Sequence, residues 1–215
     1  MEELKQKAEQ GTDRSLRPLF LELHGRVAVL GGNGADKTGL LVGLALQQIE
    51  RNGKVMCVDG RREKKTEVQF RLLLRSRAAY LPLPASLSFS PAVERALLIE
   101  VGQALKGERH SPPPLLLFDS VTEQPGVERM VTFLLNAGVT VVELLPSPQA
   151  LRFGRYNATL LLHVDSCNAD ALSRAVGRKV TPAELLALGP GEGLLVKLAQ
   201  SFPVELPQMR DKAAV

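Results

Sequence analysis

Hydrophobic residues along this chain gather in short continuous runs, and longer stretches with a helical period of apolar positions separate the runs. Strands buried on both faces of a parallel sheet have such continuous runs, and helices usually connect them. The pattern predicts an α/β fold with a mostly parallel central sheet and helices on both faces. Strands are expected at 26–30, 54–59, 115–119, 139–145, 158–164, 192–198 and 202–206, and helices at 37–52, 61–77, 91–106, 126–137, 168–177 and 182–188.

Local signals refine this outline. Pro203 interrupts the last apolar run, which indicates an edge strand. Thr181 and Glu184 have the spacing of a capping box at the start of a helix. The 215 residues are 45% hydrophobic, enough for one compact domain over residues 19–207. Residues 1–18 are expected to be a flexible or helical N-terminal segment, and 208–215 a polar tail.

A glycine-rich segment, GGNGADKT, follows the first apolar run at residues 31–38. It fits the phosphate-binding pattern G-x-x-x-x-G-K-[ST] except at Asp36, which replaces the glycine before the lysine. Backbone N–H groups between a buried strand and a helix form an anion site, where Lys37 reaches phosphates and Thr38 binds Mg²⁺. The candidate nucleotide-binding residues are Gly31, Gly34, Ala35, Asp36, Lys37 and Thr38.

Asp36 opposes nucleotide binding at this loop. A carboxylate about 5 Å from one phosphate charge, at an effective dielectric of about 20, costs roughly 3 kcal/mol, or about a hundredfold in affinity. ATP and Mg²⁺ are therefore expected to bind weakly or not at all. The alternative is that Asp36 turns outward and caps the helix, which leaves the site usable.

Hydrolysis also needs carboxylates at the ends of neighbouring strands. Asp119 ends the run LLLFDS and is the candidate Mg²⁺ ligand together with Thr38. Ser120 stands where a catalytic glutamate is expected and cannot act as a general base. Glu123 could replace it if the following turn brings it over the phosphate. An inactive or very weak ATPase is the prediction.

Several segments together resemble the HerA, FtsK and TraG-like group of RecA-type P-loop ATPases, which move or process DNA as rings. The similar stretches are LHGRVAVLGGNGADKTGLL, VMCVDGRRE, LLLFDS, NAGVTVVELLPSPQAL and NATLLLHVDSCNADALSRAVGRKVTPAELLALGPGEGLLVKL, so the resemblance covers roughly residues 22–206. It implies a RecA-like P-loop domain. It also places a sensor glutamine where this chain has Pro146, and trans-acting arginines at Arg152 and Arg155, for which surface or partner contacts are the alternative.

The chain departs from the group at the positions that bind or hydrolyse the nucleotide there, which are Asp36, Ser120 and Pro146. We therefore expect a degenerate member, which acts as a DNA-binding or partner-binding accessory subunit in DNA repair, recombination or transfer, and which can form a homo-oligomer. Two alternatives stay open: a slow but genuine DNA-associated ATPase, and a structural scaffold without a ligand.

Basic charge is concentrated in residues 61–77, although the whole chain has a net charge of only +4. Such a local field suits DNA or an acidic partner; the alternative is a solvated helix whose long side chains cover Phe70 and its leucine neighbours. Aromatic residues make up only 4%, without Trp, so stacking on bases is not expected. The candidate contacts are Arg61, Arg62, Lys64, Lys65, Arg71, Arg75 and Arg77.

The remaining features suggest structural roles. Cys57 and Cys167 lack the spacing of metal ligands and are expected to be buried, reduced thiols, and the three histidines are scattered. No apolar run reaches the roughly 18 residues that cross a bilayer, and the first residues are charged, so a cytoplasmic protein without membrane contact is expected.

Overall fold

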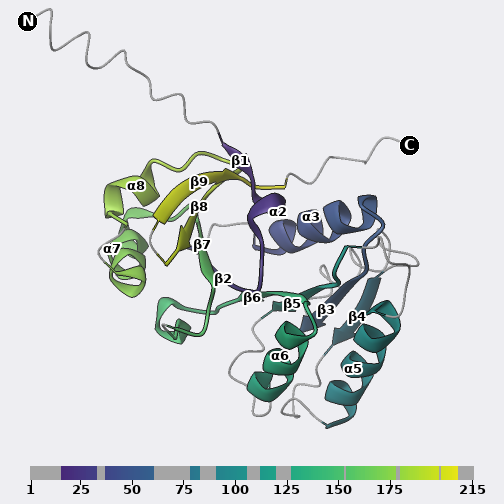
Figure 1. Cartoon of the computed structure of the whole chain (residues 1–215). Coiled ribbons are helices and arrows are strands. Elements are labelled where there is room, and N and C mark those ends of the chain that lie inside the picture. Colours follow the sequence, from purple (N-terminus) through teal and green to yellow (C-terminus); the bar gives the residue numbers. More distant parts are fainter. Residues whose placement is uncertain are drawn as a thin grey trace, which may run out of the picture.

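A nine-stranded sheet forms the centre of the described part of the chain (Figure 1). The computed structural model describes residues 16–32, 37–60, 78–82, 91–105, 112–119, 127–152, 154–177, 180–198 and 200–207. The strand order is β1-β9-β8-β7-β2-β6-β5-β3-β4. The strands are β1 (Arg17–Pro18), β2 (Arg26–Leu30), β3 (Val55–Asp59), β4 (Ala78–Pro82), β5 (Leu115–Asp119), β6 (Thr140–Leu144), β7 (Ala158–Leu162), β8 (Glu192–Lys197) and β9 (Gln200–Glu205).

The sheet is mostly parallel, as the continuous apolar runs predict. All pairings between β7 and β4 across the centre are parallel, whereas β8 is antiparallel to both β7 and β9. Every residue of β2, β3, β5 and β7 is buried, because these strands have packing on both faces. The predicted α/β fold is confirmed.

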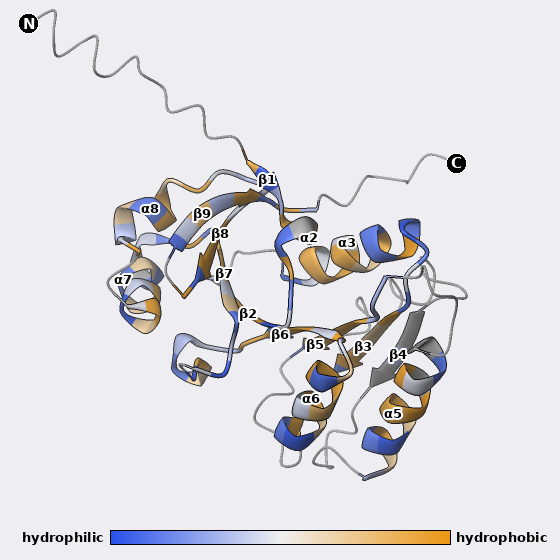
Figure 2. Ribbon diagram, viewed as in Figure 1, coloured by the Kyte–Doolittle hydropathy of each residue, from blue (hydrophilic) through white to orange (hydrophobic). Residues whose placement is uncertain are grey.

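Helices cover both faces of this sheet. They are α2 (Leu19–Glu22), α3 (Lys37–Glu50), α5 (Pro91–Leu105), α6 (Val127–Asn136), α7 (Ser166–Val176) and α8 (Pro182–Leu186). One core cluster joins α2 and α3 to one face, and two further clusters join α5 with α6, and α7 with α8, to the other. Alternate strand residues point to opposite faces, so Leu117 packs with the α3 cluster and Leu116 with the α6 cluster. Figure 2 shows the hydrophobic residues concentrated in the central strands.

Two strands were not predicted from the sequence, and one position in the sheet was predicted wrongly. β1 and β4 lack the apolar runs that mark the central strands. β9 is not an edge strand, because it pairs with β8 on one side and with β1 on the other. β1 pairs only with Val204 and Glu205, so Pro203 lies outside the stretch that β1 covers.

Other local predictions agree with the structure. The capping box is present, since the Thr181 side chain accepts from the Glu184 N–H and Glu184 accepts from the Thr181 N–H. The predicted helix at 61–77, the predicted tail at 208–215 and residues 1–15 of the predicted N-terminal segment 1–18 lie outside the described residues, whereas Arg17–Pro18 of that segment form β1. Among the described helices, none combines the length and the apolar character needed to cross a bilayer.

Candidate functional site

The candidate phosphate site lies where the parallel strands end. β2 ends at Leu30, Gly31 and Gly32 follow, and α3 begins at Lys37. Gly34, Ala35 and Asp36 lie outside the described residues, whereas Lys37 and Thr38 form the first turn of α3 and are partly exposed. Strand, glycine pair and helix thus follow one another as the motif requires.

Gly32 is a close-packed position that the motif itself does not specify. It is buried, and a Cβ atom at this residue would lie 3.4 Å from the Cα of Val164. Val164 belongs to the segment between β7 and α7. After β2 the loop therefore packs against the segment that follows the neighbouring strand β7. In the sequence, the only sign of this packing is the pair Gly31 and Gly32.

Asp119 lies on the same side of the sheet as α3. It ends β5 and continues the alternation of Leu115 and Leu117, whose side chains belong to the cluster that packs against α3. β6 separates β5 from β2. Because parallel strands end at one edge, Asp119 and the start of α3 share an edge and a face of the sheet (Figure 1).

A second carboxylate accompanies Asp119. Asp59 ends β3 and is the register partner of Asp119, and the two residues are 0% and 2% exposed. The Tyr80 hydroxyl, on β4, donates to Asp59 Oδ2 at 2.6 Å. The Gly60 N–H donates to the Asp119 carbonyl oxygen at 2.8 Å, which fixes the chain after β3. Asp59 was missing from the predicted site residues because strand register cannot be derived from local sequence.

These oxygen donors suit Mg²⁺. The ion usually binds through one or two carboxylates together with phosphates and waters, so Asp119 and the Thr38 hydroxyl fit a magnesium-nucleotide complex. No group of three or more candidate ligands from Asp, Glu, His and Cys occurs among the described residues. Any metal here would therefore depend on the phosphates of its nucleotide for further ligands.

Cys57 is confirmed as a buried, free cysteine in β3. Burial raises the pKa of its thiol well above the ordinary value, and the charges of Asp59 and Asp119 raise it further. The thiol therefore stays protonated and is a packing residue rather than a nucleophile. The side chain of Cys167 lies outside the described residues.

The remaining predicted site residues are only partly within the described chain. Pro146 is exposed and follows β6, between the ends of β2 and β5, where it offers no side-chain hydrogen bond. Ser120 and Glu123 lie outside the described residues, as do the basic residues Arg61, Arg62, Lys64, Lys65, Arg71, Arg75 and Arg77.

The other face of the sheet holds a buried ion pair that sequence analysis missed. Arg26 on β2 donates to Glu143 on β6 through Nε at 2.6 Å and Nη2 at 3.2 Å, and the two residues are 4% and 0% exposed. Arg26 Nη1 also donates to Glu128 on α6 at 2.8 Å. The Tyr156 hydroxyl donates to Glu143 Oε2 at 2.9 Å. The sequence offered one signal for this pair, because Arg26 and Glu143 are each a charged residue in an otherwise apolar run.

Burial and hydrogen bonds shift the pKa values of the acidic groups in this cluster. Burial raises the pKa of Glu143, while its hydrogen bonds from Arg26 oppose the rise. The hydrogen bond from Arg26 lowers the pKa of the more exposed Glu128. Burial is also the main reason why the pKa of Tyr156 is raised. The cluster links β2, β6 and α6 with the segment before β7, which is a structural role.

Arg155 and the described histidines have contacts within the chain. Arg155 Nη1 lies 3.4 Å from Glu128 Oε2, and both side chains are about half exposed. His163 donates through Nδ1 to the carbonyl oxygen of Leu188 at 2.9 Å, while His24 lines a pocket far from the candidate phosphate site. Arg152 is exposed, and His110 lies outside the described residues.

The chain has the α/β fold of P-loop ATPases, and solved structures of such proteins match it. No protein-family model matches the chain, and no curated protein matches it. Several solved structures do, over most of its length.

One is the genome packaging NTPase B204 from Sulfolobus turreted icosahedral virus 2 in complex with AMPPCP, with a TM-score of 0.60, 10% sequence identity, and coverage of 87% of this chain and 98% of that chain. The DNA-packaging ATPase B204 from Sulfolobus turreted icosahedral virus has a TM-score of 0.58 at 8% identity and covers 85% and 97%. The cytoplasmic domain of the Thermomonospora curvata Type VII secretion ATPase EccC has a TM-score of 0.51 at 11% identity and covers 87% and 24%.

These neighbours are P-loop ATPases of the HerA and FtsK-like kind. They agree with the resemblance derived from the sequence at the level of the fold. At identities near 10%, they do not carry over residue roles.

Proposed function

We propose that this protein is a degenerate P-loop ATPase that binds a magnesium-nucleotide weakly, hydrolyses it slowly or not at all, and serves as an accessory subunit for DNA or for a DNA-handling partner. The observation that carries the proposal is one of position. Asp119 lies at the same edge and on the same face of the sheet as Lys37 and Thr38, which begin α3. This arrangement offers a cation for phosphates and two oxygen donors for Mg²⁺.

The structural neighbours support a nucleotide ligand. The B204 NTPase has been solved with ATP-gammaS and with AMPPCP, and its fold matches this chain over most of both lengths. A DNA-related role is supported by a second neighbour, the DNA-packaging ATPase B204 from Sulfolobus turreted icosahedral virus, and by the basic charge of residues 61–77.

Weak binding and slow turnover rest on three residues of the sequence. Asp36 adds a carboxylate to the phosphate loop, Ser120 cannot accept a proton as a general base, and Pro146 lacks a donor. The described strands and helices keep the α/β fold although the chain has these three residues. The chain is therefore proposed to keep the fold of a P-loop ATPase while it binds and hydrolyses nucleotide less well.

Thermal unfolding with and without Mg-ATP tests this function. A ligand that binds only the folded state raises the melting temperature, and the rise must disappear in Lys37→Ala. DNA retention at low salt that decreases steeply with added salt tests the accessory role. A chain without nucleotide-dependent stabilisation and without salt-sensitive DNA or partner binding is a scaffold, and this outcome contradicts the proposal.

Asp59 favours a second candidate function, a slow but genuine ATPase. Its carboxylate is next to Asp119 in the sheet register, and the Tyr80 hydroxyl orients it. This carboxylate is 0% exposed, so it can replace Ser120 as the base only if the nucleotide brings the attacking water to this edge of the sheet. Phosphate release that is abolished by both Lys37→Ala and Asp59→Asn would establish this activity.

A further inference from the structure

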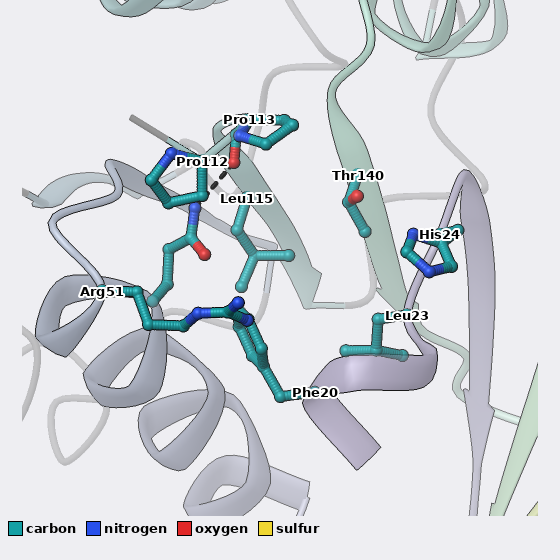
Figure 3. Close-up of a pocket in the computed structure, with 9 residues that line it drawn as sticks. Phe20, Leu23, His24, Arg51, Pro112, Pro113, Leu115 and Thr140 are labelled. Atoms are coloured by element: carbon teal, nitrogen blue, oxygen red, sulfur yellow. Dashed lines mark hydrogen bonds between the residues drawn. The ribbon is translucent and has the colours of Figure 1, made fainter. Parts of the chain in front are cut away.

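A pocket of about 310 Å³ lies at the opposite end of the sheet from the candidate phosphate site (Figure 3). Its lining includes Leu115 and Thr140, which begin β5 and β6, and Arg51, which follows the end of α3. The candidate phosphate site uses the other ends of β5 and α3. The pocket is therefore a separate place on the molecule, within the size range of small-molecule sites.

Apolar side chains form most of the pocket wall. Phe20 of α2 and Leu23, which follows α2, form one side. Pro112 and Pro113, in the segment before β5, and Leu115, which begins β5, form another. Figure 3 shows Leu115 and Leu23 facing the same space, with Arg51 lying beside Phe20. This wall suits an apolar body rather than a highly hydrated ion.

A hydrogen bond from a buried side chain helps to fix the shape of the pocket. Gln48 is 2% exposed, and its Nε2 donates to the Pro113 carbonyl oxygen at 2.6 Å, which ties α3 to the segment before β5 (Figure 3). Gly53 provides the room for this amide, because a Cβ at residue 53 would clash with the Gln48 side chain. The pocket is thus held by specific contacts and is formed before any ligand arrives.

The polar groups of the pocket are cationic or neutral. Arg51 is exposed, and its guanidinium carbon lies 4.7 Å from the centre of the Phe20 ring, which orients the guanidinium plane. His24 and the Thr140 side chain lie across the pocket from Arg51 (Figure 3). Among the described residues that line the pocket, none is acidic. A guanidinium presents a fork of donors that matches a carboxylate.

We propose that this pocket binds a small organic monoanion, a carboxylate carried on an aromatic or branched aliphatic body. The body packs against Leu23, Leu115 and the two prolines, and the carboxylate accepts hydrogen bonds from Arg51. This site is independent of the proposed nucleotide function, because none of its described lining residues belongs to the phosphate loop and these residues lie at the other end of the sheet.

The test uses the full chain labelled with ¹⁵N and three probes: phenylacetate, its neutral isostere phenylacetamide, and acetate, which keeps the charge without the apolar body. Phenylacetate is expected to give saturable shifts at the Leu115 and Thr140 backbone amides and at the Gln48 side-chain amide. A charge-assisted hydrogen bond is worth about tenfold in affinity, so phenylacetamide is expected to bind about tenfold more weakly. Acetate is expected to bind more weakly still.

Two exposed residues give a matched pair of variants. Arg51→Gln removes the pocket charge and is expected to weaken phenylacetate binding about tenfold. Lys54→Gln removes the same charge from a nearby exposed residue that does not line the pocket, and it is expected to leave binding unchanged. Arg51→Lys keeps the charge without the fork and is expected to be intermediate.

Three results overturn the proposal: no saturable shifts with phenylacetate at millimolar concentration, equal binding of phenylacetamide, or equal effects of Arg51→Gln and Lys54→Gln. Each is readable by NMR without any nucleotide. Lys37→Ala is expected to remove nucleotide binding, and Lys37 does not line this pocket, so failure here and failure of the nucleotide function give different results.

Discussion

Asp59 and Asp119 occupy equivalent positions on adjacent parallel strands, and both carboxylates are buried at the edge of the sheet where α3 begins. Buried carboxylates need hydrogen-bond or cationic partners, since burial of a polar group without a partner is strongly unfavourable. The Tyr80 hydroxyl provides one such hydrogen bond, to Asp59. A magnesium-nucleotide would add a divalent cation at this edge of the sheet.

Tyr80→Phe is therefore expected to affect both stability and ligand binding. Loss of a hydrogen bond to a buried carboxylate costs about 1–3 kcal/mol of unfolding free energy, measured by denaturant unfolding. The stabilisation by Mg-ATP should also decrease, because Asp59 loses its orientation next to Asp119.

Tyr156→Phe is the matched control for this experiment. It removes a hydroxyl that donates to a different buried carboxylate, Glu143, on the other face of the sheet. We expect a similar loss of stability with an unchanged effect of Mg-ATP. Equal effects of both variants on Mg-ATP stabilisation would argue against Asp59 as part of the nucleotide site.

Lys37→Ala should remove nucleotide-dependent stabilisation. At a ligand concentration ten times its dissociation constant, binding to the folded state adds about 1.4 kcal/mol, which corresponds to a rise of about 3–6 °C in Tm for a chain of this size. Lys37 begins α3 and is partly exposed, so its replacement should preserve the fold. Lys54→Ala is the control, and a rise that persists in Lys37→Ala would place the ligand elsewhere.

Asp36→Gly should strengthen nucleotide binding. Removal of a carboxylate about 5 Å from a phosphate charge recovers up to about a hundredfold in affinity at an effective dielectric of about 20. Titration with a fluorescent ATP analogue measures the change, and Asp36→Asn separates the charge from the size of the side chain. Unchanged affinity in both variants would show that Asp36 points away from the phosphates and that weak binding has another cause.

The central strands could be predicted from sequence because burial on both faces leaves a local signature. The observed bounds of β2 and β5 equal the predicted 26–30 and 115–119, and all seven predicted strands are present. The Lys37, Thr38 and Asp119 positions follow from these strands, since a residue that ends a parallel strand lies at a known edge. By contrast, β4 reads AAYLP, which lacks a β-branched run.

Relationships between distant segments could not be predicted, because no local pattern encodes them. Asp59 meets Asp119 through the register of β3 and β5, which lie 60 residues apart in sequence at these positions. Arg26 and Glu143 are 117 residues apart, and each reads locally as a polar residue in an apolar run. Only the strand order β2-β6 brings the two into contact.

This buried pair leads to the last prediction, which concerns Arg26→Met. The substitution leaves Glu143, 0% exposed, without the guanidinium that donates to both of its oxygens. Removal of one partner from a buried ion pair costs about 3–5 kcal/mol of unfolding free energy. The double variant Arg26→Met with Glu143→Leu should recover most of this loss, because no uncompensated charge remains.

The loss in Arg26→Met should depend on pH with a defined sign. Burial already raises the pKa of Glu143 in the folded protein, and removal of Arg26 raises it further because the opposing hydrogen bonds disappear. A folded-state pKa above the unfolded value means that the folded chain holds the proton more tightly, so stability decreases as pH rises between the two values. The deficit should be largest near neutral pH and should shrink as the pH falls toward about 5. Denaturant unfolding of both proteins across this range measures it, and a deficit that stays constant would mean that Glu143 keeps its charge without Arg26.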